Sequence, residues 1–205
     1  MTKKPPAPPL PLPLDPSVYT ESDFYSGQGM LTTIWGPGQW HFLHTMSFNY
    51  PIKPTNKDKL HYKAYILSLV HVLPCKYCRD NLQKNFKKLP LTMDKLQNRH
   101  TFSRYIYDLH EIVNTMLKKK SNLTYEQIRE RYEHFRARCS SSSTKKKRDL
   151  IKNKSKGKGK ELGCTEPLIG EKAKCVLHIV PQKTKCQTFK IDSRCTKKRR
   201  LTAKS

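Results

Sequence analysis

The 205-residue chain lacks several features that define common protein classes. No run of residues approaches the ~18 apolar residues of a membrane-spanning helix. The Pro-rich start, MTKKPPAPPLPLPL, lacks the apolar core and the cleavage site of a secretory signal peptide. Before residue 140, no stretch alternates between apolar and polar residues as a half-buried strand does. These absences predict a helical protein of the cytoplasm.

Acidic residues are also scarce. The chain has 16 Asp and Glu but 41 Lys and Arg, which gives a net charge of +25. The net charge is −1 in residues 1–28, +11 in residues 29–139 and +15 in residues 140–205. Such an imbalance favours weak binding of polyanions by the basic end of the chain. A solvated tail without a defined site explains the same pattern.

Composition divides the chain into four segments. Residues 1–28 are rich in proline and predict a flexible, polyproline-like arm. Residues 29–139 carry the apolar periodicity of a folded domain. Residues 140–160 are basic and of low complexity, which predicts a linker. Residues 161–205 form a basic tail that contains cysteines and short β-like runs.

Helix start and stop signals fill the middle of the chain. We expect the first helix to begin at Trp35, the third to open at Cys75, and the fifth to end near Arg138. Capping boxes mark the starts of the second and fifth helices, at Thr55–Asp58 and Thr124–Gln127. The predicted fold is all-α, a four-helix bundle with a short fifth helix.

In three of these helices a set of residues, most of them apolar, shares one side at a spacing of three to four residues. We expect these stripes to face the core. They comprise Trp40, Leu43, His44 and Ser47 in the first helix, Leu60, Ala64, Leu67 and His71 in the second, and Phe102, Ile106, Leu109, Val113 and Leu117 in the fourth.

Seven cysteines are many for a chain without a signal peptide. In a reducing compartment they indicate redox chemistry or metal binding rather than structural disulfides. The one closely spaced pair is Cys75 and Cys78, which Pro74 places at a helix start, where the helix dipole favours a thiolate. Lys76 and Arg79 add positive charge nearby. This is the environment that a disulfide-exchanging pair needs.

A C-x-x-C pair also occurs in zinc sites and in thioredoxin. Zinc needs four ligands, and the chain has neither a second C-x-x-C nor an H-x3–5-H pair. Thioredoxin places its pair after a strand, whereas the residues before Cys75 predict a helix. A zinc-dependent basic nucleic-acid-binding module and a thioredoxin-like oxidoreductase remain alternative interpretations.

Four motifs follow one another through residues 30–139: WGPGQWHFLH at 35–44, YP at 50–51, PCKYC at 74–78 and HEIVN at 110–114. In this order they resemble the Erv/Alr family of FAD-linked sulfhydryl (thiol) oxidases, and most of all the forms encoded by large cytoplasmic DNA viruses. The resemblance implies four helices and a short fifth helix around FAD, and usually a homodimer. For a viral member it implies a place in the host cytoplasm or the virion.

The resemblance also implies roles for single residues. Cys75 exchanges disulfides with a protein dithiol, and Cys78 passes the electrons to FAD, from which oxygen takes them to give hydrogen peroxide. Lys119 would face a phosphate or the ribose, and Tyr125 the adenine. The positions that match cofactor contacts are Gly36, Trp40, His44, His110, Val113, Asn114, Lys119 and Tyr125. No metal ligands are implied.

Two positions depart from the family pattern. Glu111 replaces the usual Asn, and it lies about 100° round the helix from His110, so we expect it to face solvent. Tyr107 stands where many cellular members have a cysteine that bridges to one after the helix. Cys139 therefore loses its expected partner.

The remaining cysteines, Cys164, Cys175, Cys186 and Cys195, are spaced C-x10-C-x10-C-x8-C in the tail. Four cysteines allow three pairings, and the sequence does not choose among them. Two roles stay open for this tail. It is either a structural appendage that docks substrates or partners, or a relay that carries electrons across the linker to Cys75.

Overall fold

A computed structural model describes residues 20–138, 164, 166–168, 170–181, 183–185 and 190–196. Most of the predicted arm, the whole linker and much of the tail lie outside these residues, so the four predicted segments stay predictions. The regular elements are α1 (Glu21–Phe24), α2 (Thr32–Phe48), α3 (Asn56–Val72), α4 (Lys76–Lys88), η1 (Met93–Leu96), α5 (Arg99–Met116), α6 (Tyr125–Glu133), β1 (Ala137–Arg138), β2 (Glu166–Pro167) and η3 (Ser193–Cys195).

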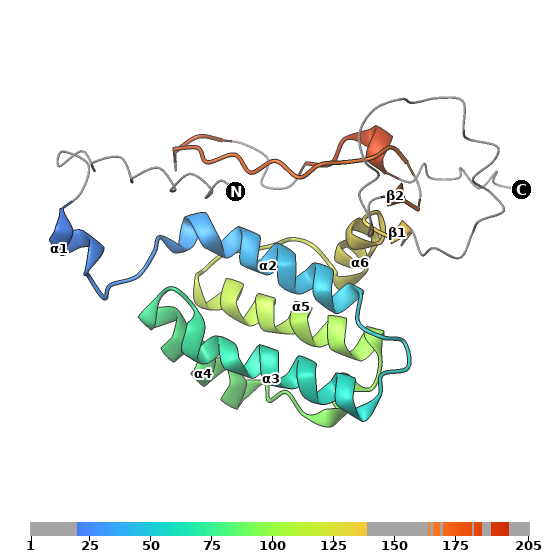
Figure 1. The fold of residues 1–205 in the computed structure, drawn as a ribbon, viewed down its shortest axis with the longest axis horizontal. Helices are drawn as coiled ribbons and strands as arrows, with labels where there is room; N and C mark the ends of the chain where they lie inside the picture. The colour runs from blue at the N-terminus through green and yellow to red at the C-terminus, as the bar shows by residue number, and fades with distance from the viewer. Residues whose placement is uncertain are drawn as a thin grey trace, which may run out of the picture.

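Helices α2 to α5 form a bundle, and the short α6 packs on α2 at one end of it (Figure 1). Helix α2 packs against α5, α3 packs against α4, and α4 also contacts α5. This confirms the all-α fold with a short fifth helix. Within the described residues, no helix has the length and apolar character needed to cross a membrane. In the part of the chain that the structure describes, β1 pairs with β2 in antiparallel register, so the fifth helix ends at Glu133 and not near Arg138 as predicted.

Helix starts follow the predicted capping chemistry. Thr55 and Asp58 form a reciprocal capping box at the start of α3, and Thr124 and Gln127 form one at the start of α6. In each box one side chain accepts a hydrogen bond from the backbone N–H group three residues on, which satisfies a donor that the helix itself leaves unpaired. A third box, at Asn98, starts α5.

Helix α2 begins at Thr32, three residues before the predicted start at Trp35. Pro37 lies inside it. Proline cannot donate to the carbonyl of Thr33, but Thr33 is exposed, so water can serve that carbonyl. The indole N–H of Trp35 donates to the carbonyl of Met30 at 3.0 Å, which fixes the entry into the helix. The prediction of the start at Trp35 was therefore wrong.

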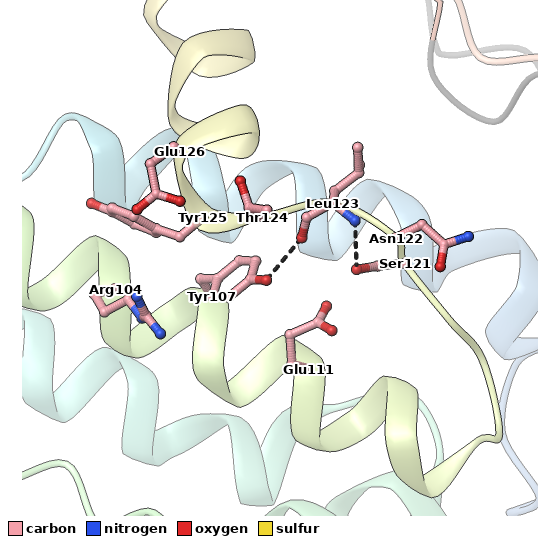
Figure 2. Close-up of a pocket in the computed structure, with 9 residues that line it drawn as sticks. All are labelled: Arg104, Tyr107, Glu111, Ser121, Asn122, Leu123, Thr124, Tyr125 and Glu126. Carbon is pink, nitrogen blue, oxygen red and sulfur yellow. Dashed lines mark hydrogen bonds between the residues drawn. The ribbon is translucent and has the colours of Figure 1, made fainter.

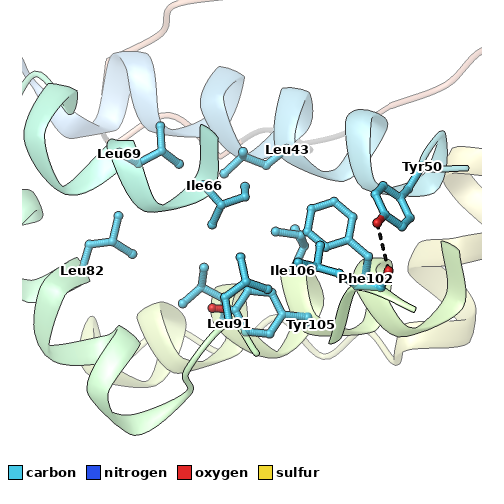
Figure 3. Close-up of a cluster of buried hydrophobic side chains, with 11 residues drawn as sticks. Leu43, Tyr50, Ile66, Leu69, Leu82, Leu91, Phe102, Tyr105 and Ile106 are labelled. Carbon is cyan, nitrogen blue, oxygen red and sulfur yellow. Dashed lines mark hydrogen bonds between the residues drawn. The ribbon is translucent and has the colours of Figure 1, made fainter. Parts of the chain in front are cut away.

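The core lies between α2, α3, α4 and α5 (Figure 3). Leu43 of α2 and Phe102, Ile106 and Leu109 of α5 are buried in it, as the stripes of these helices predicted. Leu117 is exposed because α5 ends at Met116. Tyr50 is fully buried, and its hydroxyl donates to the carbonyl of Leu96 at 2.9 Å, so η1 is tied to the end of α2.

The prediction of which side of α3 faces the core is wrong. Its four members, Leu60, Ala64, Leu67 and His71, are all exposed. The buried residues of α3 are Ile66 and Leu69, with Tyr62 and Leu73 packed beside them. Helix α3 carries apolar residues on two sides at the same helical spacing, so periodicity alone did not distinguish the inner side.

We predict that Ile66→Ala lowers the free energy of unfolding by about 2–5 kcal/mol, because it leaves a cavity in the core. Ile66 is 0% exposed, whereas Ile52 is 67% exposed. The matched change Ile52→Ala therefore costs less than about 0.5 kcal/mol. Urea unfolding of both variants measures the difference, and equal costs would contradict the assigned face of α3.

Candidate active site

Cys75 is the N-cap residue of α4, and its Sγ accepts a hydrogen bond of 3.2 Å from the backbone N–H of Cys78. Both cysteines are free thiols and partly buried. The guanidinium of Arg79 donates to the carbonyl of Leu73, which ties α4 back to the end of α3. The predicted pair thus sits at the positive end of a helix, where a backbone donor already points at the sulfur of Cys75.

The two thiols differ in their surroundings. Burial, a hydrogen bond with Cys75 and the charge of Cys75 raise the pKa of the Cys78 thiol to about 12, although Arg79 opposes the shift. The backbone N–H of Cys78 instead donates to Sγ of Cys75. Burial therefore disfavours a thiolate on Cys78 in the reduced pair, whereas a hydrogen-bond donor already points at Cys75.

Trp40, His44 and His110 come together between α2 and α5. The rings of Trp40 and His110 stack with centroids 4.0 Å apart and planes 6° from parallel. His44 Nε2 and His110 Nδ1 share a hydrogen bond of 3.0 Å. One of these nitrogens must donate and the other accept, so the pair shares a single proton across the contact. The structure thus brings together three of the predicted cofactor residues.

Aromatic rings continue from this pair toward α6. Phe48 follows His44 by one helical turn, and its ring stacks on Tyr132 at 5.4 Å and on Tyr125 at 6.1 Å. Tyr125 is buried, and its hydroxyl shares a hydrogen bond of 2.8 Å with Ser103. The sequence analysis did not predict Phe48 and Tyr132 as members of this group. The spacing of four residues from His44 to Phe48 could have indicated Phe48.

The other predicted cofactor residues lie on α2, on α5 or just beyond the end of α5. Val113 and Asn114 are half-buried on α5, and Gly36 is half-buried on α2. Lys119 is exposed beyond the end of α5, where its N–H donates to the carbonyl of Asn114 at 2.8 Å. Glu111 is half-buried rather than solvent-facing, because its carboxylate accepts a hydrogen bond of 3.0 Å from the side chain of Asn114.

A cavity of about 360 Å³ lies between α5 and the segment that leads into α6 (Figure 2). Tyr107 and Glu111 enter it from α5, and Tyr125 from α6. The hydroxyl of Tyr107 donates to the carbonyl of Leu123 at 2.8 Å across one side of it. Of the eight predicted cofactor positions only Tyr125 lines this cavity, so it adjoins the aromatic group rather than coinciding with it.

Buried nitrogens without partners test whether these residues fit a flavin cofactor. In the described part of the chain, the buried side-chain nitrogens without a hydrogen-bond partner are His44 Nδ1, Gln39 Nε2, Asn81 Nδ2 and Asn85 Nδ2. Each costs about 1–3 kcal/mol unless a hydrogen-bond partner reaches it. Flat aromatic rings, an unpaired imidazole nitrogen and unpaired amide donors suit a planar ring that carries both hydrogen-bond donors and acceptors, as FAD does. The residues therefore fit the group.

The sequence analysis did not predict Asn81 and Asn85 as site residues. They follow Cys78 by three and seven residues, so all three side chains share one face of α4. Both amides are buried on that face. Their spacing from the redox cysteine was a usable signal, because an asparagine inside a helix at a core position needs a partner.

The described tail cysteines differ in state. Cys164 is disulfide-bonded, whereas Cys175 and Cys195 are free. Cys139 and Cys186 lie outside the described residues. Among the residues that are described, no group of three or more His, Cys, Asp and Glu is arranged to hold a metal ion.

Comparison with known proteins agrees with the motifs. The model of the Erv1 / Alr family matches residues 37–133, which include both cysteines of the pair. A probable FAD-linked sulfhydryl oxidase of Acanthamoeba polyphaga mimivirus is 39% identical over 99 residues, which cover 48% of this chain and 68% of that protein. The chain belongs to the Erv1/Alr family.

Two further similar proteins are a viral oxidase and a solved yeast structure. An FAD-linked sulfhydryl oxidase of African swine fever virus is 34% identical over 86 residues, covering 42% of this chain and 70% of the viral protein. The solved core of yeast Erv1 matches with a TM-score of 0.46 and 22% identity, over 50% of this chain and 84% of that chain. The family match leaves the tail uncovered, since it ends at residue 133.

We predict that acid destabilises the chain through the buried histidine pair. Burial, followed by the neighbouring His110 and His41, lowers the pKa of His44 to about 3, and burial lowers the pKa of His110 to about 4. Below the ordinary pKa of 6.5 the unfolded chain gains protons that the folded chain excludes, so stability falls as pH falls from 6.5 toward 4. Urea unfolding should show a loss of at least about 2 kcal/mol between pH 7.5 and pH 4.5.

His44→Gln removes one of these groups and should flatten the pH dependence of the free energy of unfolding. The same change at the exposed His71 is the matched control and should leave the slope as it is. A slope that is the same in both variants would show that the histidine pair does not cause the acid sensitivity.

Proposed function

We propose that this chain is an FAD-dependent thiol oxidase that forms disulfides in protein dithiols. The observation that carries the proposal is the position of the Cys75–Cys78 pair at the start of α4, in a member of a family whose viral relatives are described as FAD-linked sulfhydryl oxidases. The N-cap position of Cys75 supports it as the sulfur that the second step releases, because the backbone N–H of Cys78 already donates to it.

In the oxidised pair, a substrate thiolate attacks Sγ of Cys75, and the Cys75–Cys78 bond breaks to release the Cys78 thiolate. The second substrate thiol then attacks the substrate sulfur of the mixed disulfide, and Cys75 leaves. The substrate gains a disulfide, and the pair gains two electrons and two protons. The backbone N–H of Cys78 stabilises the charge on the departing Cys75 sulfur, because it already donates to that atom.

FAD, when bound, supplies a two-electron acceptor for the reduced pair. Trp40, His44 and His110 would hold it through their flat rings and the unpaired Nδ1 of His44. Asn81 and Asn85 present further donors on the face of α4 that follows Cys78. Asn114 and Lys119 supply an amide and a positive charge near the end of α5.

We propose molecular oxygen as the final acceptor, so that one protein dithiol and one oxygen molecule give one disulfide and one hydrogen peroxide. The assignment rests on the family resemblance, and the atoms and electrons balance without a further reactant. The cytoplasmic location, host cytoplasm or virion for a viral member, and weak binding of polyanions by the basic tail stay predictions.

Cys75→Ser and Cys78→Ser should each abolish oxygen consumption with dithiothreitol while the bundle stays folded. The reason is that each removes one sulfur of the relay, and neither sulfur is a core side chain. Wild-type protein should be yellow, with flavin absorbance near roughly 450 nm. A colourless protein with bound zinc would support the nucleic-acid-binding alternative, and turnover in either serine variant would place the relay elsewhere.

We propose that the exposed apolar stripe of α3 is the face on which the predicted homodimer forms. Its residues Leu60 and Leu67 are large, apolar and exposed, which is unfavourable on a free surface. Leu60→Glu with Leu67→Glu should halve the mass measured by sedimentation equilibrium. A dimer that persists in the double variant would place the interface elsewhere.

A further inference from the structure

The segment Gln28–Leu31, here called the strap, lies against the backbone just before the redox pair. Gly29 forms an antiparallel bridge with Cys75, and the N–H of Met30 donates to the carbonyl of Pro74 at 2.8 Å. The carbonyl of Met30 in turn accepts the indole N–H of Trp35 at 3.0 Å. Both backbone groups of Met30 are thus used to hold the strap beside Cys75.

The strap requires glycine at its point of closest approach. Gly29 has a φ of +99°, and a Cβ atom there would lie 2.6 Å from the carbonyl oxygen of Pro74. A side chain would therefore be strained by its backbone and would collide with a neighbour that cannot move easily. By contrast, a Cβ at Gly27, just before the strap, would meet nothing within 4 Å.

The backbone of the strap is held by hydrogen bonds, but its large side chains are exposed to solvent. Met30 is 69% exposed and Leu31 is 74% exposed. Tyr77, between the two cysteines, is 69% exposed, and Val72, at the end of α3, is 66% exposed. Figure 1 shows the connection from α1 to α2 and the turn from α3 to α4 at the same end of the bundle. Exposed apolar side chains are therefore present in the strap and in the segments on both sides of Cys75.

We propose that the strap, with Tyr77 and Val72, is a docking surface for extended, apolar segments that flank the cysteines of a reduced, unfolded polypeptide. The proposal deepens the proposed function and rests on it. A substrate sulfur must reach Sγ of Cys75, so the residues next to that sulfur must lie on the surface around Cys75. Those residues are exposed and apolar in an unfolded chain, whereas a folded protein buries them.

The bridge also decides which part of the strap a substrate meets. It holds Gly29 beside Cys75, so a chain whose sulfur bonds to Cys75 Sγ lies next to the residues that follow Gly29, Met30 and Leu31. Exchange then proceeds as described above: the substrate sulfur bonds to Cys75 Sγ, the Cys75–Cys78 bond breaks, and the electron pair stays on Cys78. Apolar contacts with Met30 and Leu31 hold the mixed disulfide until the second substrate thiol attacks it.

Two synthetic dithiol peptides of equal length and equal cysteine spacing test this surface. One carries leucines beside each cysteine, and the other carries serines. The full chain with bound flavin should oxidise the leucine peptide with about tenfold higher kcat/KM, as partial burial of two apolar side chains on each partner implies. Dithiothreitol turnover is measured for every variant, because a wild type that fails with dithiothreitol would refute the proposed function rather than the docking surface.

Met30→Ser with Leu31→Ser should bring the ratio of the two kcat/KM values close to one. The double variant Ile52→Ser with Met93→Ser, which removes exposed apolar residues remote from Cys75 in the chain, should keep the wild-type ratio. Equal kcat/KM for both peptides in the wild type would overturn the proposal. A strap double variant that still prefers the leucine peptide would also overturn it. If the double variant changes only the mass measured by sedimentation, the strap is instead an interface between two copies of the chain.

Gly29→Ala gives a second test that leaves both apolar side chains in place. It should displace the strap and lower the ratio of kcat/KM values, whereas Gly27→Ala should keep it. A preference retained in Gly29→Ala, with folding confirmed by circular dichroism, would show that the position of the strap does not matter for substrates.

Discussion

The hydrogen bond from the N–H of Cys78 to Sγ of Cys75 is the interaction on which the site depends. The first N–H groups of a helix need acceptors, and here the acceptor is a sulfur rather than the usual oxygen. One contact therefore starts α4 and also prepares the sulfur to carry negative charge. Pro74, which cannot donate, places that sulfur at the start of the helix, and Arg79 ties the same turn back to α3.

The second constraint is the repeat of rings along α2. Trp40, His44 and Phe48 follow one another by one turn each, and α5 and α6 supply His110, Tyr125 and Tyr132 against them. The core on the other side, built on Leu43 and Ile106, holds α2 and α5 in this register. Packing thus fixes the spacing of the rings, and the buried, unpaired Nδ1 of His44 favours a polar ligand among them.

Local signals in the sequence predicted local structure well. The capping boxes at Thr55 and Thr124, the cysteine at the start of α4 and the motif order all correspond to what the structure shows or to the family match. The inner face of α3 was not predictable, since both of its sides are apolar. The contact of Glu111 with Asn114 depends on the rotamers of the two side chains. The approach of Gly29 to Cys75 brings together segments that are distant in the chain. Periodicity encodes neither of them.

Tyr107 occupies the place where the family resemblance expects a cysteine. Its hydroxyl reaches the carbonyl of Leu123 and joins α5 to the segment before α6 by a hydrogen bond. A disulfide at this joint would open whenever the surroundings became strongly reducing. A phenol does not react with thiols, so a reductant leaves this link between α5 and the segment before α6 intact. The chain thereby separates the bonds it exchanges from the contact that holds this joint together.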